Sequence, residues 1–231
     1  MRTKSSPHRA VFLEVGALIN NLIPFGIMIA AGAAAMWRGA PYPALVFLAL
    51  LAACFAIRLW LTSGPDKEVA EQRHKSRESV MVFLVFLGMA LVPIVTIGTP
   101  IFDFAAYIAS PLQLTAGIVV GVAGLFLFWR SHADLGKNWS AELELRREHE
   151  LVVSGVYRFI RHPMYSAIFL IVFGQLLVLN NWIAGPLGLV AFLILYLMRI
   201  DAEELMMKDQ FGDSWEEYAD RTPRLIPHLK G

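Results

Sequence analysis

Apolar residues in this chain form six long blocks that are separated by polar connections. The blocks contain 17 to 26 residues. A helix needs roughly 20 apolar residues, at ~1.5 Å each, to cross the ~30 Å hydrocarbon core of a bilayer. The pattern therefore predicts an all-α, polytopic integral membrane protein with about six transmembrane helices. The predicted spans are residues 11–36, 43–61, 80–98, 112–129, 163–179 and 183–200.

The composition agrees with a membrane protein. Hydrophobic residues make up 57% of the chain and charged residues 17%, and the mean hydropathy is +0.55, values well away from those of soluble domains. The single cysteine, Cys54, allows neither an intramolecular disulfide nor a cysteine-based metal site. His132 and Asp134 have no third ligand at a suitable spacing, so no metal is expected. A net charge of +1 argues against a nucleic-acid partner.

Lysine and arginine residues alternate between the two sides of the predicted membrane. On one side there are three in the N-terminal tail, four in the second connection, six in the fourth and five in the C-terminal tail. On the other side there is one in the first connection and none in the third or the fifth. Because cytoplasmic loops carry the excess of Lys and Arg, both termini are predicted to be cytoplasmic. The chain shows no organelle signal, and we expect it in a bacterial inner membrane.

Two polar clusters flank the last two predicted spans. One is residues 149–165, HELVVSGVYRFIRHPMY, and the other is residues 199–204. Pro163 suits the first turn of a helix because its missing N–H needs no partner there, and Asn180–Asn181 is a turn signal. Two helices of 17 and 18 residues joined by that turn form a matched antiparallel hairpin. Both clusters are therefore expected at the same end, about one helix diameter (~10 Å) apart.

The second cluster has a plain structural interpretation as well as a functional one. Arg199 and Glu203 are four residues apart, so they share one helix face and could form an ordinary ion pair. Glu204 is turned by about 100° from Glu203 and would face another partner. Residues 201–220 place apolar side chains among acids, which predicts an amphipathic cytosolic helix interrupted at Gly212.

The residues of both clusters match a known pattern. The first fits His-x-Leu-Val-x-x-Gly-x-Tyr-x-x-x-Arg-His-Pro-x-Tyr at every specified position, and Arg199-x-x-x-Glu203-Glu204, Phe211-Gly212, Tyr218 and Arg224-Leu-Ile-Pro227 follow in order. Over residues ~135–228 the chain resembles the isoprenylcysteine carboxyl methyltransferase and phospholipid methyltransferase superfamily of integral membrane methyltransferases. Residues 1–130 are then expected to be an N-terminal four-helix region, and residues 131–231 the methyltransferase core.

The resemblance implies that S-adenosylmethionine binds at the cytoplasmic face and leaves as S-adenosylhomocysteine, while a lipophilic acceptor enters from the bilayer. Arg199, Glu203 and Tyr165 are the implied catalytic residues. No obligate protein partner is implied beyond membrane lipids and the acceptor. By position, the implied cofactor-binding residues are His149, Leu151, Val152, Gly155, Tyr157, Arg161, His162, Pro163, Glu203 and Glu204.

The residue types suit this chemistry. Glutamates and aromatic faces favour the sulfonium cation, an arginine favours the carboxylate, and Gly155 would let the backbone approach the ligand. Arg199 would orient a carboxylate acceptor, whereas an amine acceptor would need a base such as Glu203. Carboxyl methylation of a prenylcysteine-like substrate is the leading prediction, and phospholipid amine methylation is the alternative. Ala167 and Trp215 depart from the family's usual glycine and tyrosine.

Two further alternatives come from other classes of protein. An NADPH-dependent sterol-type reductase has a distantly similar C-terminal half, although the complete Arg161-His162-Pro163 run with Glu203–Glu204 argues against it. A non-catalytic membrane scaffold would use both clusters only as ion-paired helix ends. Binding measurements distinguish the three hypotheses: the methyltransferase should bind S-adenosylhomocysteine, the reductase should bind NADPH, and the scaffold should bind neither.

Overall fold

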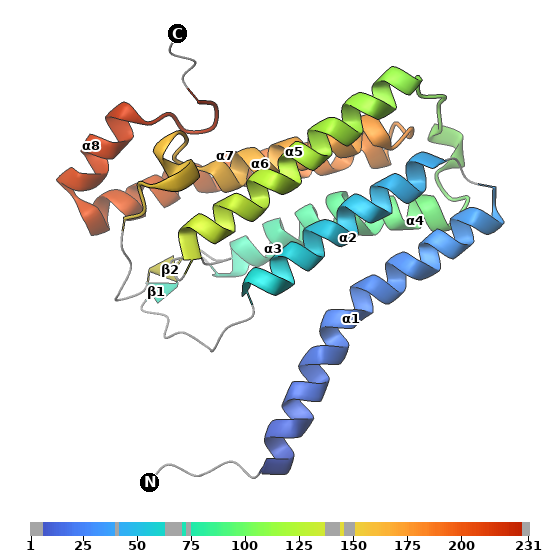
Figure 1. Ribbon diagram of the computed structural model, residues 1–231, viewed down its shortest axis with the longest axis horizontal. Coiled ribbons are helices and arrows are strands. Elements are labelled where there is room, and N and C mark those ends of the chain that lie inside the picture. Colours follow the sequence, from blue (N-terminus) through green and yellow to red (C-terminus); the bar gives the residue numbers. More distant parts are fainter. Residues whose placement is uncertain are drawn as a thin grey trace.

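The computed structural model describes residues 7–39, 42–62, 71–72, 75–136, 144–145 and 151–227, and within this part helices dominate (Figure 1). The predicted all-α class is confirmed for these residues, apart from one antiparallel pair of two-residue strands, β1 and β2. The elements are α1 Pro7–Trp37, α2 Tyr42–Thr62, β1 Glu71–Gln72, α3 Lys75–Phe86, η1 Leu87–Leu91, α4 Val92–Gly98, η2 Asp103–Ala105, α5 Pro111–Leu135, β2 Glu144–Leu145, η4 Gly155–Arg158, α6 Pro163–Val178, α7 Ala184–Phe211 and α8 Asp213–Arg221.

Four helical stretches in the described part are long and apolar enough to cross a membrane: Tyr42–Trp60, Val80–Gly98, Pro111–Leu135 and Ala184–Phe211. Two shorter apolar helical stretches were found. Leu22–Trp37 overlaps the later part of the first predicted span, residues 11–36, and Pro163–Val178 nearly coincides with the fifth, residues 163–179. Every predicted apolar block is therefore helical. The count of six spans and their orientation stay predictions.

Helices α5 and α6 lie side by side at very short range because glycines line their contact. A Cβ on Gly117 would lie 2.8 Å from the Leu177 and Val178 side chains, and a Cβ on Gly174 would lie 2.9 Å from the Gly121 Cα. In a bilayer such close approach allows backbone-to-backbone van der Waals packing, which replaces the hydrophobic drive available in water. On α5 the contact is formed by Gly117, Gly121 and Gly124.

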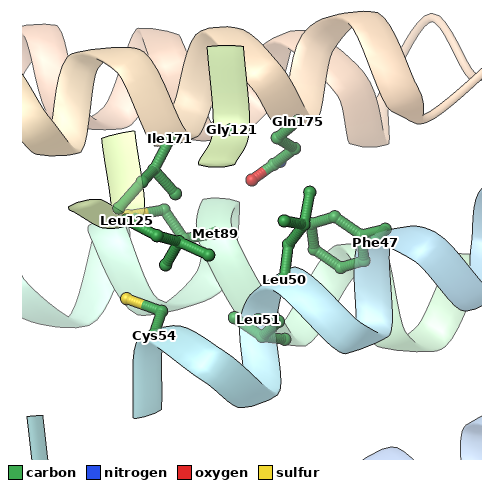
Figure 2. Close-up of a pocket in the computed structure, with 9 residues that line it drawn as sticks. All are labelled: Phe47, Leu50, Leu51, Cys54, Met89, Gly121, Leu125, Ile171 and Gln175. Atoms are coloured by element: carbon green, nitrogen blue, oxygen red, sulfur yellow. The ribbon is translucent and has the colours of Figure 1, made fainter. Parts of the chain in front are cut away.

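Helix α2 packs below this pair, against a small apolar cavity (Figure 2). The cavity is lined by Phe47, Leu50, Leu51, Cys54, Met89, Gly121, Leu125, Ile171 and Gln175. Gln175 is its main polar member and is 3% exposed. Its Nε2 donates to Gly88 O at 2.9 Å and to Ala184 O at 2.8 Å, so one amide joins η1, α6 and the start of α7.

The α6–α7 connection is a tight turn, as Asn180–Asn181 predicted. The Asn181 side-chain oxygen accepts from the backbone N–H groups of Ile183 and Ala184, both at 3.0 Å, which satisfies free donors at the start of α7. Its amide nitrogen donates to Phe102 O at 2.7 Å. The turn is therefore fixed to the η2 segment at one end of the helices.

At the opposite end, α7 continues beyond its apolar part as one helix of 28 residues. It ends at Gly212, whose φ of +55° favours glycine. The predicted interruption at Gly212 is confirmed, and α8 then packs through buried Trp215 and Tyr218. Figure 1 shows α8, η4 and the segment after α8 gathered at this end of the molecule. The division at residue 130 stays a prediction; α5 passes through it without a break.

Candidate functional site

The start of α6 and the polar end of α7 meet, as the hairpin geometry predicted. Glu204 Oε1 lies 3.1 Å from both Arg161 Nη2 and His162 Nε2. Glu203 Oε2 accepts from the Tyr165 hydroxyl at 2.6 Å and lies 3.6 Å from Arg199 Nε. The i,i+4 pair of Arg199 and Glu203 is thus present, but Glu203 also contacts α6. Glu204 faces different partners, as its position on the helix predicted.

His162 lies at the centre of this cluster, directly before Pro163, which occupies the first turn of α6. Burial lowers the pKa of His162, but its contacts with Glu203 and Glu204 raise that pKa by more, so it lies above its ordinary value. Nδ1 is 3.7 Å from Glu203 Oε1, while Nε2 is 3.1 Å from Glu204 Oε1. A protonated imidazole has two donors and therefore suits two carboxylates.

The segment 222–227 forms a third side of the cluster. The Arg161 N–H donates to Pro223 O at 2.8 Å, and the His162 N–H donates to Arg224 O at 3.0 Å. Arg161 Nη1 donates to Thr222 O at 2.7 Å and also to Ala219 O. In the part of the chain that the structure describes, the buried Arg161 Nε has no hydrogen-bond partner. Arg161 is therefore held firmly and retains one donor.

Arg224 is a site residue that the sequence reasoning missed. Its Nη2 donates to Glu204 Oε2 at 2.6 Å, and the same nitrogen lies 3.6 Å from Asp201 Oδ1. Glu204 and Asp201 raise the pKa of Arg224, so it stays charged. Its place in the Arg224-Leu-Ile-Pro227 run was a signal, but nothing in the sequence placed that run beside α7.

The turn η4 is fixed by groups on both sides. Gly155 has a φ of +60°, and a Cβ there would overlap the Asp134 carboxylate. The Tyr157 hydroxyl donates to Ser131 O at 3.3 Å, and the Tyr218 hydroxyl donates to Tyr157 O at 2.5 Å. Burial raises the pKa of Tyr157, and it raises the pKa of Tyr218 to about 12, so both hydroxyls remain donors. The close neighbour of Gly155 is thus Asp134, which the sequence reasoning did not place here.

The predicted site residues fall into three groups. Arg161, His162, Tyr165, Arg199, Glu203 and Glu204 are brought together in the cluster. Leu151, Val152, Gly155 and Tyr157 lie on the segment that leads into α6, and Pro163 is the first residue of α6. His149 lies outside the described residues. The role of each in binding or catalysis stays a prediction.

The fold and the cluster define a class: a helical integral membrane protein with a polar, mostly cationic cluster where the fifth and sixth apolar helices end. Residues 116–209 match the sequence model of the Isoprenylcysteine carboxyl methyltransferase (ICMT) family. The matched region contains α6, α7 up to residue 209, and all the cluster residues except Arg224. Over residues 116–209 this chain is therefore similar to the isoprenylcysteine carboxyl methyltransferase family.

Individual proteins show the same similarity. The chain is 30% identical over 128 residues to a protein-S-isoprenylcysteine O-methyltransferase of Schizosaccharomyces pombe, a match that covers 54% of this chain and 52% of that protein. It is 32% identical over 119 residues to protein-S-isoprenylcysteine O-methyltransferase B of Arabidopsis thaliana, which covers 49% of this chain and 58% of that protein. The chain thus spans about half the length of these relatives.

A solved structure of the eukaryotic intramembrane Ras methyltransferase ICMT has a similar fold. The TM-score is 0.55 with 17% identity, and the likeness covers 98% of this chain and 88% of that chain. It extends over the N-terminal helices, for which the sequence offered no motif. At this identity the likeness concerns the fold alone.

Proposed function

We propose that this chain transfers a methyl group from S-adenosylmethionine to the carboxylate of a prenylcysteine-like lipid at the cytoplasmic face of a membrane. One observation carries the proposal: Arg161, His162, Tyr165, Glu203 and Glu204, which match the family pattern, form a single bonded cluster within the region that matches the family. The relatives are named for O-methylation of protein S-isoprenylcysteine.

The residues present fit S-adenosylmethionine. This cofactor carries an anionic carboxylate and two cationic groups, an ammonium and a sulfonium, and it supplies an electrophilic methyl group when bound. The buried Arg161 Nε offers a donor to the carboxylate. Glu204, whose oxygens already accept from Arg161 and Arg224, offers its negative charge to a cation. The proposed cofactor-binding set is His149, Leu151, Val152, Gly155, Tyr157, Arg161, His162, Pro163, Glu203 and Glu204.

Aromatic side chains next to the cluster suit a lipid acceptor. The Tyr165 ring lies 6.0 Å from the Phe192 ring and 5.4 Å from the Tyr196 ring, between α6 and α7. Tyr165 joins these rings to Glu203 through its hydroxyl. An apolar tail in contact with the rings would place its polar head beside Arg199, which we propose orients it. Positioning and exclusion of water then supply most of the catalysis, because methyl transfer is an in-line displacement.

The charges of the cluster favour a carboxylate acceptor over an amine. With His162 protonated, cations outnumber anions in the cluster by four to three: Arg161, His162, Arg199 and Arg224 face the carboxylates of Glu203, Glu204 and Asp201. An anionic acceptor offsets this excess, whereas a cationic one adds to it. An amine acceptor would also need a base, and Glu203 already accepts from Tyr165 while facing Arg199 and His162.

Two experiments test the proposal. Calorimetric titration of the purified protein in detergent should show binding of S-adenosylhomocysteine and none of NADPH. Incubation with methyl-labelled S-adenosylmethionine should then label a farnesylated N-acetylcysteine, and mild base should release the label as methanol, since an ester hydrolyses and a methylamine does not. Base-stable label on phosphatidylethanolamine instead would establish the amine reaction. Binding of NADPH alone would establish the reductase, and binding of neither compound would contradict the methyltransferase.

A further inference from the structure

Asp134 occupies an unusual place in the last turn of α5. A carboxylate near a helix C-terminus faces the negative end of the helix dipole, so it lowers the stability of the helix that carries it. Arg130, one turn earlier, offsets part of this through Nη2 at 2.6 Å from Asp134 Oδ1. The Asp134 side chain is 13% exposed. Helix stability therefore does not account for an aspartate here.

The contact made by the second carboxylate oxygen of Asp134 explains why an aspartate occupies this position. Oδ2 accepts from the Val156 N–H at 2.9 Å, across 22 residues of sequence. Gly155 lies against the same carboxylate with a φ of +60°, and a Cβ on Gly155 would overlap it. One oxygen is thus oriented by Arg130, and the other holds the first residues of η4.

The anchor acts on the segment that enters the cluster. From Val156 the chain reaches Arg161 within five residues. The other contact between η4 and α5, from the Tyr157 hydroxyl to Ser131 O, is longer at 3.3 Å. Helix α5 packs closely on α6 through glycines, so a group on its last turn is fixed relative to the start of α6. A loop that is hydrogen-bonded to a helix is positioned more precisely than a loop without such support.

We propose that Asp134 is a positioning residue for the S-adenosylmethionine site, which it acts on through Val156 and Gly155. The inference rests on the proposed function. Asp134 touches neither cofactor nor acceptor in this scheme. It sets the turn from which the backbone runs to Arg161 and His162, and so determines whether Arg161 and the residues of η4 face the cofactor together.

The test compares Asp134→Ala and Asp134→Asn with Asp103→Ala. Asp103 is the control, since it also pairs with an arginine, Arg38, at 2.7 Å but lies in η2, beside the α6–α7 turn at the other end of the helices. Asp134→Ala should weaken S-adenosylhomocysteine binding about tenfold and raise the KM for S-adenosylmethionine, while the KM for the acceptor and kcat change little. Asp134→Asn keeps an oxygen for the Val156 N–H and should restore most of the affinity. Asp103→Ala should bind like the wild type.

A second pair of variants approaches the same contact from the turn. Gly155→Ala should weaken S-adenosylhomocysteine binding because its methyl group overlaps the Asp134 carboxylate. Gly39→Ala is the control: Gly39 has a φ of +63° but open space around it, so it bears the same backbone strain without the overlap. If Asp134→Ala does not fold, unchanged binding by Gly155→Ala still overturns the positioning role of Asp134.

The outcomes separate the two proposals. A wild-type protein that binds no S-adenosylhomocysteine overturns the proposed function, and the role of Asp134 with it. If the wild type binds, affinities of Asp134→Ala and Gly155→Ala within twofold of it overturn the positioning role alone. Equal losses in Asp134→Ala and Asp103→Ala, or a fall in kcat without a change in the KM for S-adenosylmethionine, also overturn that role.

Discussion

Glu204 shows how one carboxylate can hold three segments of the chain together. Its Oε1 contacts Arg161 and His162 at the start of α6, and its Oε2 accepts from Arg224 in the segment after α8. Removing each of these cationic groups from water costs free energy, and their attraction to the shared carboxylate offsets that cost. Removal of Glu204 leaves three cationic groups without this anion, so its effect should extend over the whole cluster.

Glu204→Ala and Arg161→Ala should therefore weaken S-adenosylhomocysteine binding at least about tenfold, the loss expected when one partner of a buried charged hydrogen bond is removed. Calorimetry of each purified variant measures the change. Glu217→Ala serves as a control, since Glu217 pairs with Arg221 on an exposed face of α8. Unchanged affinity in both test variants, with the proteins folded, would remove these residues from the site.

The charge on His162 predicts a dependence of stability on pH. Its pKa in the folded protein is raised, so the folded state binds the proton more tightly than the unfolded state. The stabilisation is complete below the ordinary pKa of about 6.5 and is lost as the pH rises through the higher pKa of the folded state. Thermal unfolding in detergent across this range should show the wild type losing more stability with rising pH than His162→Gln. Parallel curves would contradict a charged His162.

At the scale of elements, Pro93 explains the π-helix η1 within the third long apolar helix. Proline has no N–H, so Pro93 cannot donate to a carbonyl one turn back. The Val92 N–H bonds to Leu87 O, in the wider π register. Gly88 O accepts instead from Gln175 on α6. In a bilayer, where water does not satisfy such groups, a freed carbonyl needs a partner from a neighbouring helix.

The glycine contact between α5 and α6 predicts opposite effects for two similar substitutions. Gly174→Ala should destabilise the protein by about 1–3 kcal/mol, because its Cβ would lie 2.9 Å from Gly121 Cα and 3.0 Å from Gly117 O, which are backbone atoms. Gly26→Ala in α1 has nothing within 4 Å and should stabilise by about 0.4–1 kcal/mol through helix propensity. Thermal unfolding of both variants measures the difference, and destabilisation of equal size would contradict the close contact.

At the scale of the whole molecule, the proposed chemistry requires the cluster to face the cytoplasm. The α6–α7 turn and the α8 region lie at opposite ends of the helices (Figure 1). In a background with Cys54→Ser, Trp182→Cys should react with a membrane-impermeant maleimide in intact spheroplasts, whereas Asp220→Cys should react only after permeabilisation. Both positions are exposed in the structure, so access depends on the side of the membrane. The reverse pattern would contradict the predicted orientation.

The sequence by itself determined the helical class, the apolar blocks and the meeting of the two polar clusters. Apolar runs are local signals, and burial in lipid leaves a helix little alternative. Pro163 and Asn180–Asn181 marked the ends of α6. Two antiparallel apolar segments of 17 and 18 residues joined by a short turn place their other ends at the same level. The closeness of Glu203 and Glu204 to the start of α6 followed from that geometry, although their individual partners did not. The break at Gly212 followed from its residue type.

Only the tertiary structure decided which further groups surround the cluster. Arg224 reaches Glu204 through an irregular segment, and Asp134 reaches Val156 across 22 residues. Neither contact could be predicted from a periodic pattern or a fixed spacing in the sequence. Each involves a segment without regular structure, and such a segment can place the same residue in many positions. Asp134 in particular has the residue type of a metal ligand or a solvated helix end. Its role as an anchor exists only because α5 packs against α6 and ends beside the turn that leads to Arg161.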